Sequence, residues 1–273
     1  DEDVPRLLLN GRFVFQYGTL AQGVWAESGY TAPTDEALLY NIKMSKDLGM
    51  NMIRIHYYAE PRRFYAYADK LGILLWQDMP GNKSADQEGK DALRNNFIAE
   101  MRDFFTQHLS APSIAVWTPF NESWGLFKPG EIAQAIEKWD SSRPILANAW
   151  AGFDQNYDFN DAHLYDNYVD YGPVPHWIGK WGPSALAKDS RPTATVITEF
   201  GGARILMNEK YIAQDYGYGD KFEDDVEGAT SFYTGIMKRL LFLKRLGLSS
   251  AVYTQTTDTS NEPNGIATLD RST

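Results

Sequence analysis

Short apolar runs alternate along this chain with longer segments in which apolar residues recur at helical spacing. Leu38, Leu39, Ile42 and Leu48 have this spacing and follow Thr34, a residue type that often caps a helix amino terminus. Continuous apolar runs bounded by Gly or Pro are typical of buried strands. The pattern predicts an α/β protein with helices over 35–48, 62–71, 93–109, 131–139 and 226–246.

Eight strands are predicted between and around these helices, over 13–18, 51–58, 73–78, 114–120, 144–150, 161–165, 193–200 and 250–256. Strands that alternate with helices favour a parallel sheet, and eight such units can close into a (β/α)₈ TIM barrel. The segment 151–192 is rich in Asp, Asn, Tyr, Gly and Pro, and no helix is evident there. No repeat or linker divides the chain, so we expect a single domain over 1–273.

The composition excludes several classes of partner and cofactor. The net charge is −10 and the pI about 4.9, so nucleic acid and anionic membranes would repel the chain, and no apolar run has the length of a membrane span. Without cysteine there are no disulfides or thiolate metal sites. The histidines lack ligand spacing and no Gly-rich phosphate loop follows a strand. We therefore expect neither a metal nor another cofactor.

The first residue is Asp1 rather than Met, which predicts a processed or cut amino terminus. The sequence leaves the compartment open between the cytoplasm and a secreted or periplasmic location. It also leaves the oligomeric state open.

Two of the predicted strands end in glutamate. The run 112–120 leads into Asn121 and Glu122, and the run 193–198 leads into Glu199. In a parallel barrel the carboxyl ends of all strands share the face that holds the active site. Two carboxylates at that face suit a glycosidase, although a strand-end Glu can also cap the next helix.

The two glutamates would need different environments. Glu122 is the expected proton donor and base, with a pKa raised by an apolar pocket and the second carboxylate. Glu199 is the expected nucleophile, which must stay ionised. We predict that the carboxyl groups lie about 5–5.5 Å apart, the separation of retaining enzymes.

Further polar residues lie at the predicted strand ends. Arg54 interrupts an apolar strand and could donate to Glu199, as could Tyr165, which shares a strand face with His163. A surface ion pair for Arg54 and a core position for His163 are the alternatives. His56 and Asp78 complete this set; Asp78 could bind a sugar hydroxyl or cap a helix.

Aromatic residues make up 14% of the chain and include 8 Trp. Most are expected in the core. Trp124 and Trp150 stand beside polar residues at strand ends, where the C–H faces of a sugar could pack on their rings. This mixture of aromatic and polar residues favours a carbohydrate partner.

A set of motifs runs along nearly the whole chain, at 9–15, 52–58, 63–73, 112–123, 140–144, 199–202, 251–258, Asn264-Gly265 and 269–271. On these motifs the chain resembles the catalytic barrel of glycoside hydrolase family 2, which contains β-galactosidases, β-glucuronidases and β-mannosidases. The resemblance implies hydrolysis with retention through a covalent glycosyl-enzyme.

The resemblance also implies roles for single residues. It gives Glu122 as acid/base, Glu199 as nucleophile and Asn121 as the residue that holds the sugar 2-hydroxyl. It places Arg54, Tyr165 and His163 beside the nucleophile. Gln255 ends the last strand where many relatives have Trp, and we expect it to bind substrate.

The same resemblance leaves the sugar unassigned and raises two alternatives. Members of the family usually carry β-sandwich domains before the barrel, and we expect these domains to be absent here. An excised or engineered barrel with weak or no activity is therefore one alternative. A carbohydrate-binding protein without turnover is the other.

Overall fold

The computed structural model describes residues 4–81, 83–85, 87, 89–122, 124–149, 157–165, 193–205 and 225–272. Trp150 lies outside these residues, as does most of the segment 151–192. Within the described ranges, none of the helices combines the length and apolar character that crossing a bilayer requires.

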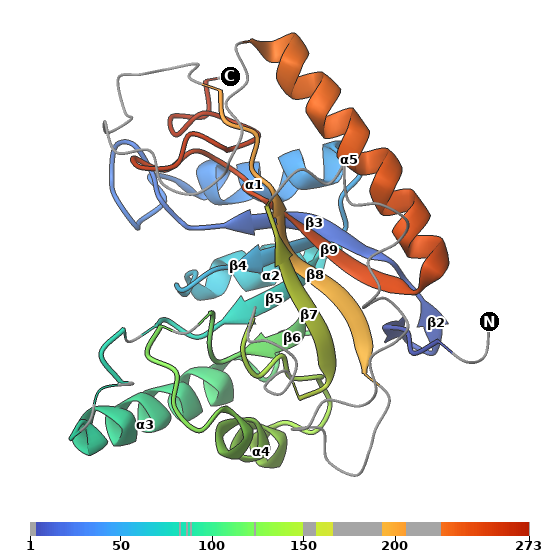
Figure 1. The fold of residues 1–273 in the computed structure, drawn as a ribbon. Helices are drawn as coiled ribbons and strands as arrows, with labels where there is room; N and C mark the ends of the chain where they lie inside the picture. The colour runs from blue at the N-terminus through green and yellow to red at the C-terminus, as the bar shows by residue number, and fades with distance from the viewer. Residues whose placement is uncertain are drawn as a thin grey trace.

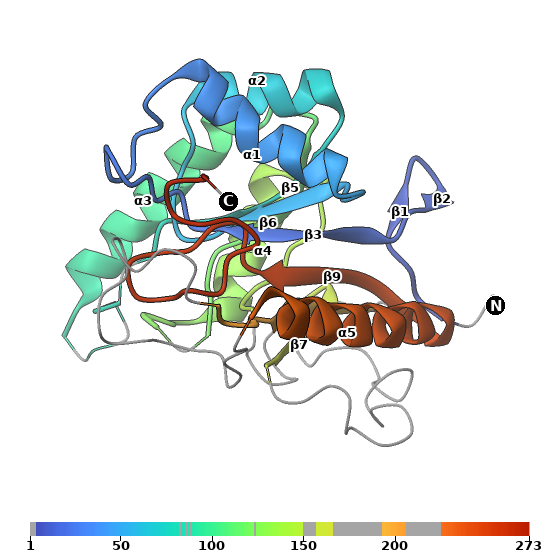
Figure 2. The same ribbon diagram turned by 90° about the horizontal axis from the view of Figure 1, so that it is seen from above.

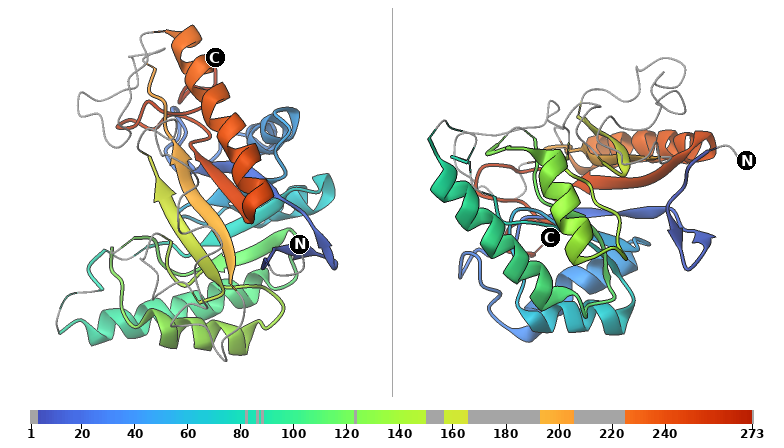
Figure 3. Two further views of the ribbon diagram at one scale, coloured as in Figure 1. Left: turned by 45° about the vertical axis from the view of Figure 1, so that its right-hand side comes forward. Right: turned by 90° about the horizontal axis from the view of Figure 1, so that it is seen from below.

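A seven-stranded sheet forms the centre of the molecule, with strands in the order β6-β5-β4-β3-β9-β8-β7. Every neighbouring pair is parallel. The strands are β3 (Gln16–Ala21), β4 (Met52–Ile55), β5 (Leu74–Asp78), β6 (Ile114–Thr118), β7 (Phe159–Leu164), β8 (Ala194–Gly201) and β9 (Leu248–Thr254). The sheet is curled, so that β7 and β8 run steeply across the front of the other strands (Figure 1, Figure 3). A separate antiparallel hairpin joins β1 (Leu8–Leu9) to β2 (Arg12–Phe13).

Helices cover the outer side of the curled sheet, with α1 and α2 on one side of the strands and α5 on the opposite side (Figure 2). They are α1 (Asp35–Asp47), α2 (Arg62–Leu71), α3 (Asp91–His108), α4 (Pro129–Trp139) and α5 (Val226–Leu246). The predicted cap of α1 is confirmed, because the Thr34 hydroxyl accepts from the Ala37 N–H at 3.1 Å. The α/β class and the helix positions agree with the sequence to within a few residues.

The predicted strand 144–150 differs from the others. Its described part pairs with β6 and the residues after it through isolated parallel bridges, Trp117 to Ile145 and Asn121 to Ala149, rather than through a continuous ladder. Pro144 has no N–H to donate. On the side away from β6, the N–H of Ile145 donates to a carboxylate oxygen of Asp158 at 2.9 Å. The segment therefore lies beside β6 without forming a regular strand.

The apolar core has an outer part under the helices and an inner part on the concave side of the sheet. Strands β4 and β8 are buried at every position, as expected when parallel strands are covered on both faces. The inner part takes one or more side chains from each sheet strand and from the segment beside β6. Its members include Leu20, Met52, Trp76, Val116, Leu146, Ala149, Phe159, Val196 and Val252.

Candidate active site

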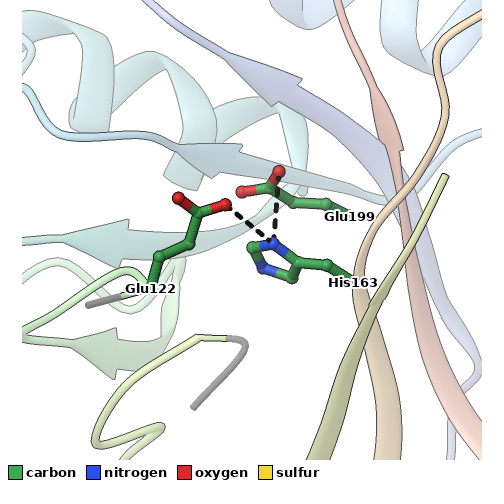
Figure 4. A group of neighbouring side chains, drawn as sticks. All are labelled: Glu122, His163 and Glu199. Carbon is green, nitrogen blue, oxygen red and sulfur yellow. Dashed lines mark ion pairs between the residues drawn. The ribbon is translucent and has the colours of Figure 1, made fainter. Parts of the chain in front are cut away.

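The polar side chains predicted for the site gather at the carboxyl ends of the strands, which open on one face because the strands are parallel. Arg54 lies in β4, His163 in β7 and Glu199 in β8, whereas Asn121 and Glu122 follow β6. Figure 4 shows His163 between the two glutamates. Residues distant in sequence are thus brought together as the strand-end pattern predicted.

Arg54 connects β4 to three other parts of this face, and its side chain has no exposed surface. Nε and Nη2 donate to the two carboxylate oxygens of Asp78 at 3.1 and 2.8 Å. Nη1 donates to Glu199 Oε1 and to the Thr198 carbonyl, both at 3.1 Å. Nη2 also donates to Asn121 Oδ1 at 2.7 Å. These bonds use all the N–H donors of a guanidinium group, so Arg54 donates to Glu199 as predicted, and the alternative of a surface ion pair is wrong.

Asp78 lies beneath Arg54 and is almost fully buried. Burial raises the pKa of Asp78 to about 6, although the Arg54 charge opposes this shift. Both of its oxygens are engaged by Arg54, so its observed contacts orient that guanidinium. Its expected contact with a sugar hydroxyl stays a prediction.

Glu199 is surrounded by donors, and only 7% of its side chain is exposed. The Tyr165 hydroxyl donates to Oε2 and also lies 3.2 Å from the Thr254 hydroxyl. His56 Nε2 lies 3.8 Å from Oε1. Together with Arg54, these neighbours hold the carboxylate in place.

Glu122 stands on a left-handed backbone turn, with φ of 56°, which is uncommon for a residue with a side chain. Its N–H donates to the Ala149 carbonyl at 2.6 Å, which fixes the turn. Oε2 accepts from Trp124 Nε1 at 2.7 Å, and Oε1 lies 3.3 Å from His163 Nδ1. The turn thus directs this half-buried carboxylate between an indole and an imidazole.

These contacts contradict one expectation from the sequence. The His163 contact lowers the pKa of Glu122, and the Trp124 hydrogen bond adds to this effect, while burial opposes it. Both contacts stabilise the negative charge. The expectation of a raised pKa is therefore wrong for this arrangement of side chains.

The two site histidines have different surroundings. His163 is buried, and its Nδ1 is shared between Glu122 Oε1 and Glu199 Oε2, at 3.3 and 3.5 Å. Burial holds the pKa of His56 well below its usual value, and the Arg54 charge contributes to this. His56 therefore faces Glu199 as a neutral imidazole.

Glu122, His163 and Glu199 each offer an oxygen or nitrogen atom within 4.8 Å of the other two. Among the described residues this is the group whose donor set could hold a metal ion. The same carboxylate oxygens would be needed for a two-carboxylate reaction. The expected lack of a metal stays a prediction.

Gln255 is buried in a polar cluster that the sequence analysis did not identify. Gln255 Nε2 donates to Glu262 Oε2 at 3.1 Å and to Asn264 Oδ1 at 2.7 Å, and Gln22 Nε2 donates to the same Glu262 oxygen at 2.7 Å. Burial raises the pKa of Glu262, and the nearby charge of Glu199 adds to this shift. Glu262 stands two residues before the Asn264-Gly265 motif, and this position was the signal in the sequence from which it could have been found.

Removing Arg54 should destabilise the whole protein. In Arg54→Met, Asp78 and Glu199 would remain buried without their cation, which typically costs about 3–5 kcal/mol. Urea denaturation would measure this as a fall in the free energy of unfolding. Arg63→Ala is the control, because Arg63 and its partner Asp35 are both about half exposed and such pairs contribute roughly 0–1 kcal/mol. Equal losses in the two variants would contradict the role given to Arg54.

Comparisons with known proteins show which chains this one is similar to. No family model matches the chain. The β-glucuronidase of Bacteroides fragilis is 27% identical over 228 residues, which cover 77% of this chain and 32% of that enzyme. The β-galactosidase of Lactococcus lactis is 26% identical over 152 residues, covering 51% of this chain and 14% of that enzyme. The chain thus spans a third or less of the length of these relatives.

The fold has close counterparts among solved structures. A glycoside hydrolase family 2 β-galacturonidase from Eisenbergiella tayi, solved with galacturonate, superimposes with a TM-score of 0.72 at 20% identity. The match covers 97% of this chain and 50% of that one. The resemblance predicted from the motifs is therefore confirmed: the chain is similar in sequence to β-glucuronidases and β-galactosidases, and it shares its fold with a glycoside hydrolase family 2 enzyme.

Proposed function

We propose that this chain is a retaining glycoside hydrolase that acts through a covalent glycosyl-enzyme. The observation that carries the proposal is the approach of a Glu122 oxygen and a Glu199 oxygen to within 4.8 Å. Inverting enzymes keep their carboxyl groups roughly 6.5–9.5 Å apart to leave room for a water. Oxygens of the two carboxylates that approach to within 4.8 Å are closer to the arrangement of retaining enzymes, whose carboxyl groups lie about 5–5.5 Å apart, and this supports direct attack by one carboxylate.

The proposal includes a closed (β/α)₈ barrel formed as a single domain over 1–273. The bridges from β6 to the segment 145–149 support an eighth strand position between β6 and β7. The inner core supports closure as well, because it receives side chains from that segment and from every sheet strand. A closed barrel would hold Glu122 and Glu199 at a fixed separation.

In the first step, Glu199 attacks the anomeric carbon while the bond to the leaving oxygen breaks. Glu122 gives its proton to that oxygen. In the second step, Glu122 takes a proton from water, whose oxygen attacks the anomeric carbon on the face that the leaving group occupied and displaces Glu199 on the opposite face. Arg54 and Tyr165 orient Glu199 in both steps, and Asn121, held by Arg54, is placed for the 2-hydroxyl.

The lowered pKa of Glu122 has a consequence for the pH profile. Glu122 must be protonated to act as an acid, so kcat/KM should fall as the pH rises through its pKa. Contacts that lower this pKa move the fall to lower pH. We expect an optimum on the acidic side of neutrality.

In Trp124→Phe, the fall of kcat/KM with rising pH, the basic limb of the profile, should move to higher pH. The ring is kept but the N–H donated to Glu122 is lost, so the pKa of Glu122 rises and its proton is retained to higher pH. The measurement is kcat/KM against pH with an aryl glycoside whose leaving group is poor. Trp139→Phe, in α4, is the matched control and should leave the limb in place. A limb that moves to lower pH in Trp124→Phe would contradict the assignment.

A panel of nitrophenyl β-glycosides tests the proposed function. It should include the glucuronide, galacturonide, galactoside and mannoside, since the relatives with these names leave the sugar open. Release of nitrophenol from at least one is expected, and proton NMR should show the β-anomer as the first product. Binding without release would indicate a carbohydrate-binding protein, and a first-formed α-anomer would exclude retention.

A further inference from the structure

An exposed lysine lies beside the candidate acid/base. Lys83, in the connection between β5 and α3, places its Nζ 4.8 Å from the centre of the Trp124 ring. This ring is 43% exposed, and its Nε1 donates to Glu122. A positive charge and an accessible aromatic face are therefore joined directly to the carboxylate that would protonate the leaving group.

The backbone around Lys83 is fixed on both sides. A Cβ at Gly81 would lie 2.0 Å from the Tyr57 ring, so this backbone is pressed against Tyr57. The Tyr57 hydroxyl in turn donates to the Asn121 carbonyl at 2.9 Å. On the other side, Arg94 Nε donates to the Ala85 carbonyl at 2.7 Å. Tyr57 thus lies between the backbone near Lys83 and Asn121, the residue before Glu122.

The two oxygens of Glu122 face different sides, and this shows on which side Lys83 and Trp124 lie. Oε1 faces His163 and, beyond it, Glu199, whereas Oε2 faces Trp124. In a two-carboxylate reaction the sugar undergoing attack lies over the nucleophile, and the leaving group lies beside the acid. Trp124 and Lys83 therefore border the position of the leaving group.

Its exposed charge distinguishes Lys83 from Arg54. All donors of Arg54 are occupied by protein groups, and Arg54 is buried. Lys83 is exposed, and its field reaches into the site, where it contributes to the lowered pKa of His56. It can attract an anionic group that approaches Glu122 from solvent.

We propose that Lys83 and Trp124 form a binding position for a leaving group that is a ring bearing a negative charge, such as a uronic acid or a sulfated sugar. The ring stacks on the indole and the anionic group pairs with the ammonium. This inference rests on the proposed glycosidase function and extends it to the group on the far side of the scissile bond.

The test compares three aryl glycosides that carry the sugar identified by the panel. One has an uncharged nitrophenyl leaving group, one adds a ring carboxylate and one adds a ring sulfonate. For each, kcat/KM is measured in the wild type and in Lys83→Met. Comparing the two proteins on each substrate removes differences in intrinsic leaving-group reactivity.

Lys83→Met should lower kcat/KM for the two charged substrates about three- to fivefold more than for the uncharged one, the size of an exposed ion pair. Lys83→Arg should retain the preference, and added salt should weaken it in the wild type. Lys128→Met is the control, since Lys128 is exposed and paired with Glu131 instead. A loss confined to one charged substrate would identify carboxylate or sulfonate as the group recognised.

The outcomes separate the two proposals. If the wild type turns over all three substrates and Lys83→Met affects them equally, the inference about the leaving group fails and the glycosidase stands. If the wild type releases no nitrophenol from any sugar, both proposals fail. Circular dichroism of each variant shows that the comparison is made between folded proteins.

Discussion

Glu199→Gln should abolish turnover, with a loss in kcat of roughly a thousandfold or more, the scale seen when a nucleophile is removed. The amide has nearly the same shape as the carboxylate, so it can still accept from Arg54 Nη1 through its oxygen. It cannot form the covalent bond to the anomeric carbon. The measurement is nitrophenol release from the best glycoside of the panel, with thermal unfolding to show that the fold is kept.

A matched substitution shows whether the loss of activity is specific to Glu199 or follows from removing any carboxylate. Glu131→Gln changes an exposed residue of α4 and should leave activity intact. Azide gives a second control. An external anion that replaces the nucleophile attacks the anomeric carbon on the face opposite the leaving group and gives a product of inverted configuration. Rescue of Glu199→Gln by azide to a product of retained configuration would therefore show that Glu199 is not the nucleophile.

Glu122→Ala should produce a second large loss, but one that depends on the leaving group. Substrates whose leaving oxygen needs a proton should lose about a hundredfold to ten thousandfold, the usual contribution of general acid catalysis. Acidic phenols need little protonation, so their glycosides should still form the glycosyl-enzyme. The measurement is kcat/KM across a series of phenols of different acidity, which should fall more steeply with phenol pKa in the variant.

Azide should restore turnover in Glu122→Ala, because this anion attacks the glycosyl-enzyme without a base. The product should be the glycosyl azide of retained configuration, which NMR can identify. An equal loss for all leaving groups would instead indicate that Glu122 supports the fold or binds the sugar. The pair of variants thus tests which carboxylate has which role.

The parts of the molecule that were predicted correctly depend on local sequence. Helix α1 has its own cap at Thr34 and its own apolar spacing, and Glu199 lies near the end of a run of Ala, Val, Ile and Thr that favours a strand. The parallel arrangement then brings the ends of β6 and β8 to one face without further information. Local pattern and strand direction were sufficient for the two glutamates and for Arg54.

The parts that could not be predicted depend on contacts between distant residues. The lowered pKa of Glu122 comes from His163 and from an indole placed by a left-handed turn, and neither contact has a periodic pattern. Glu262 meets Gln22 across 240 positions of sequence. The segment 144–149 has the composition of a strand but its amide at Ile145 is taken by a side chain.

The five hydrogen bonds of Arg54 have a consequence for how this scaffold can be changed. They make the floor of the site part of the framework that keeps the molecule folded, so sequence diversity introduced there would be removed by misfolding before selection for activity could act. The exposed rim at Lys83 does not hold the fold together in this way, and it can vary as long as Trp124 keeps its hydrogen bond to Glu122. Libraries aimed at new acceptors or leaving groups belong on that rim, where variation can accumulate while the chemistry underneath stays constant.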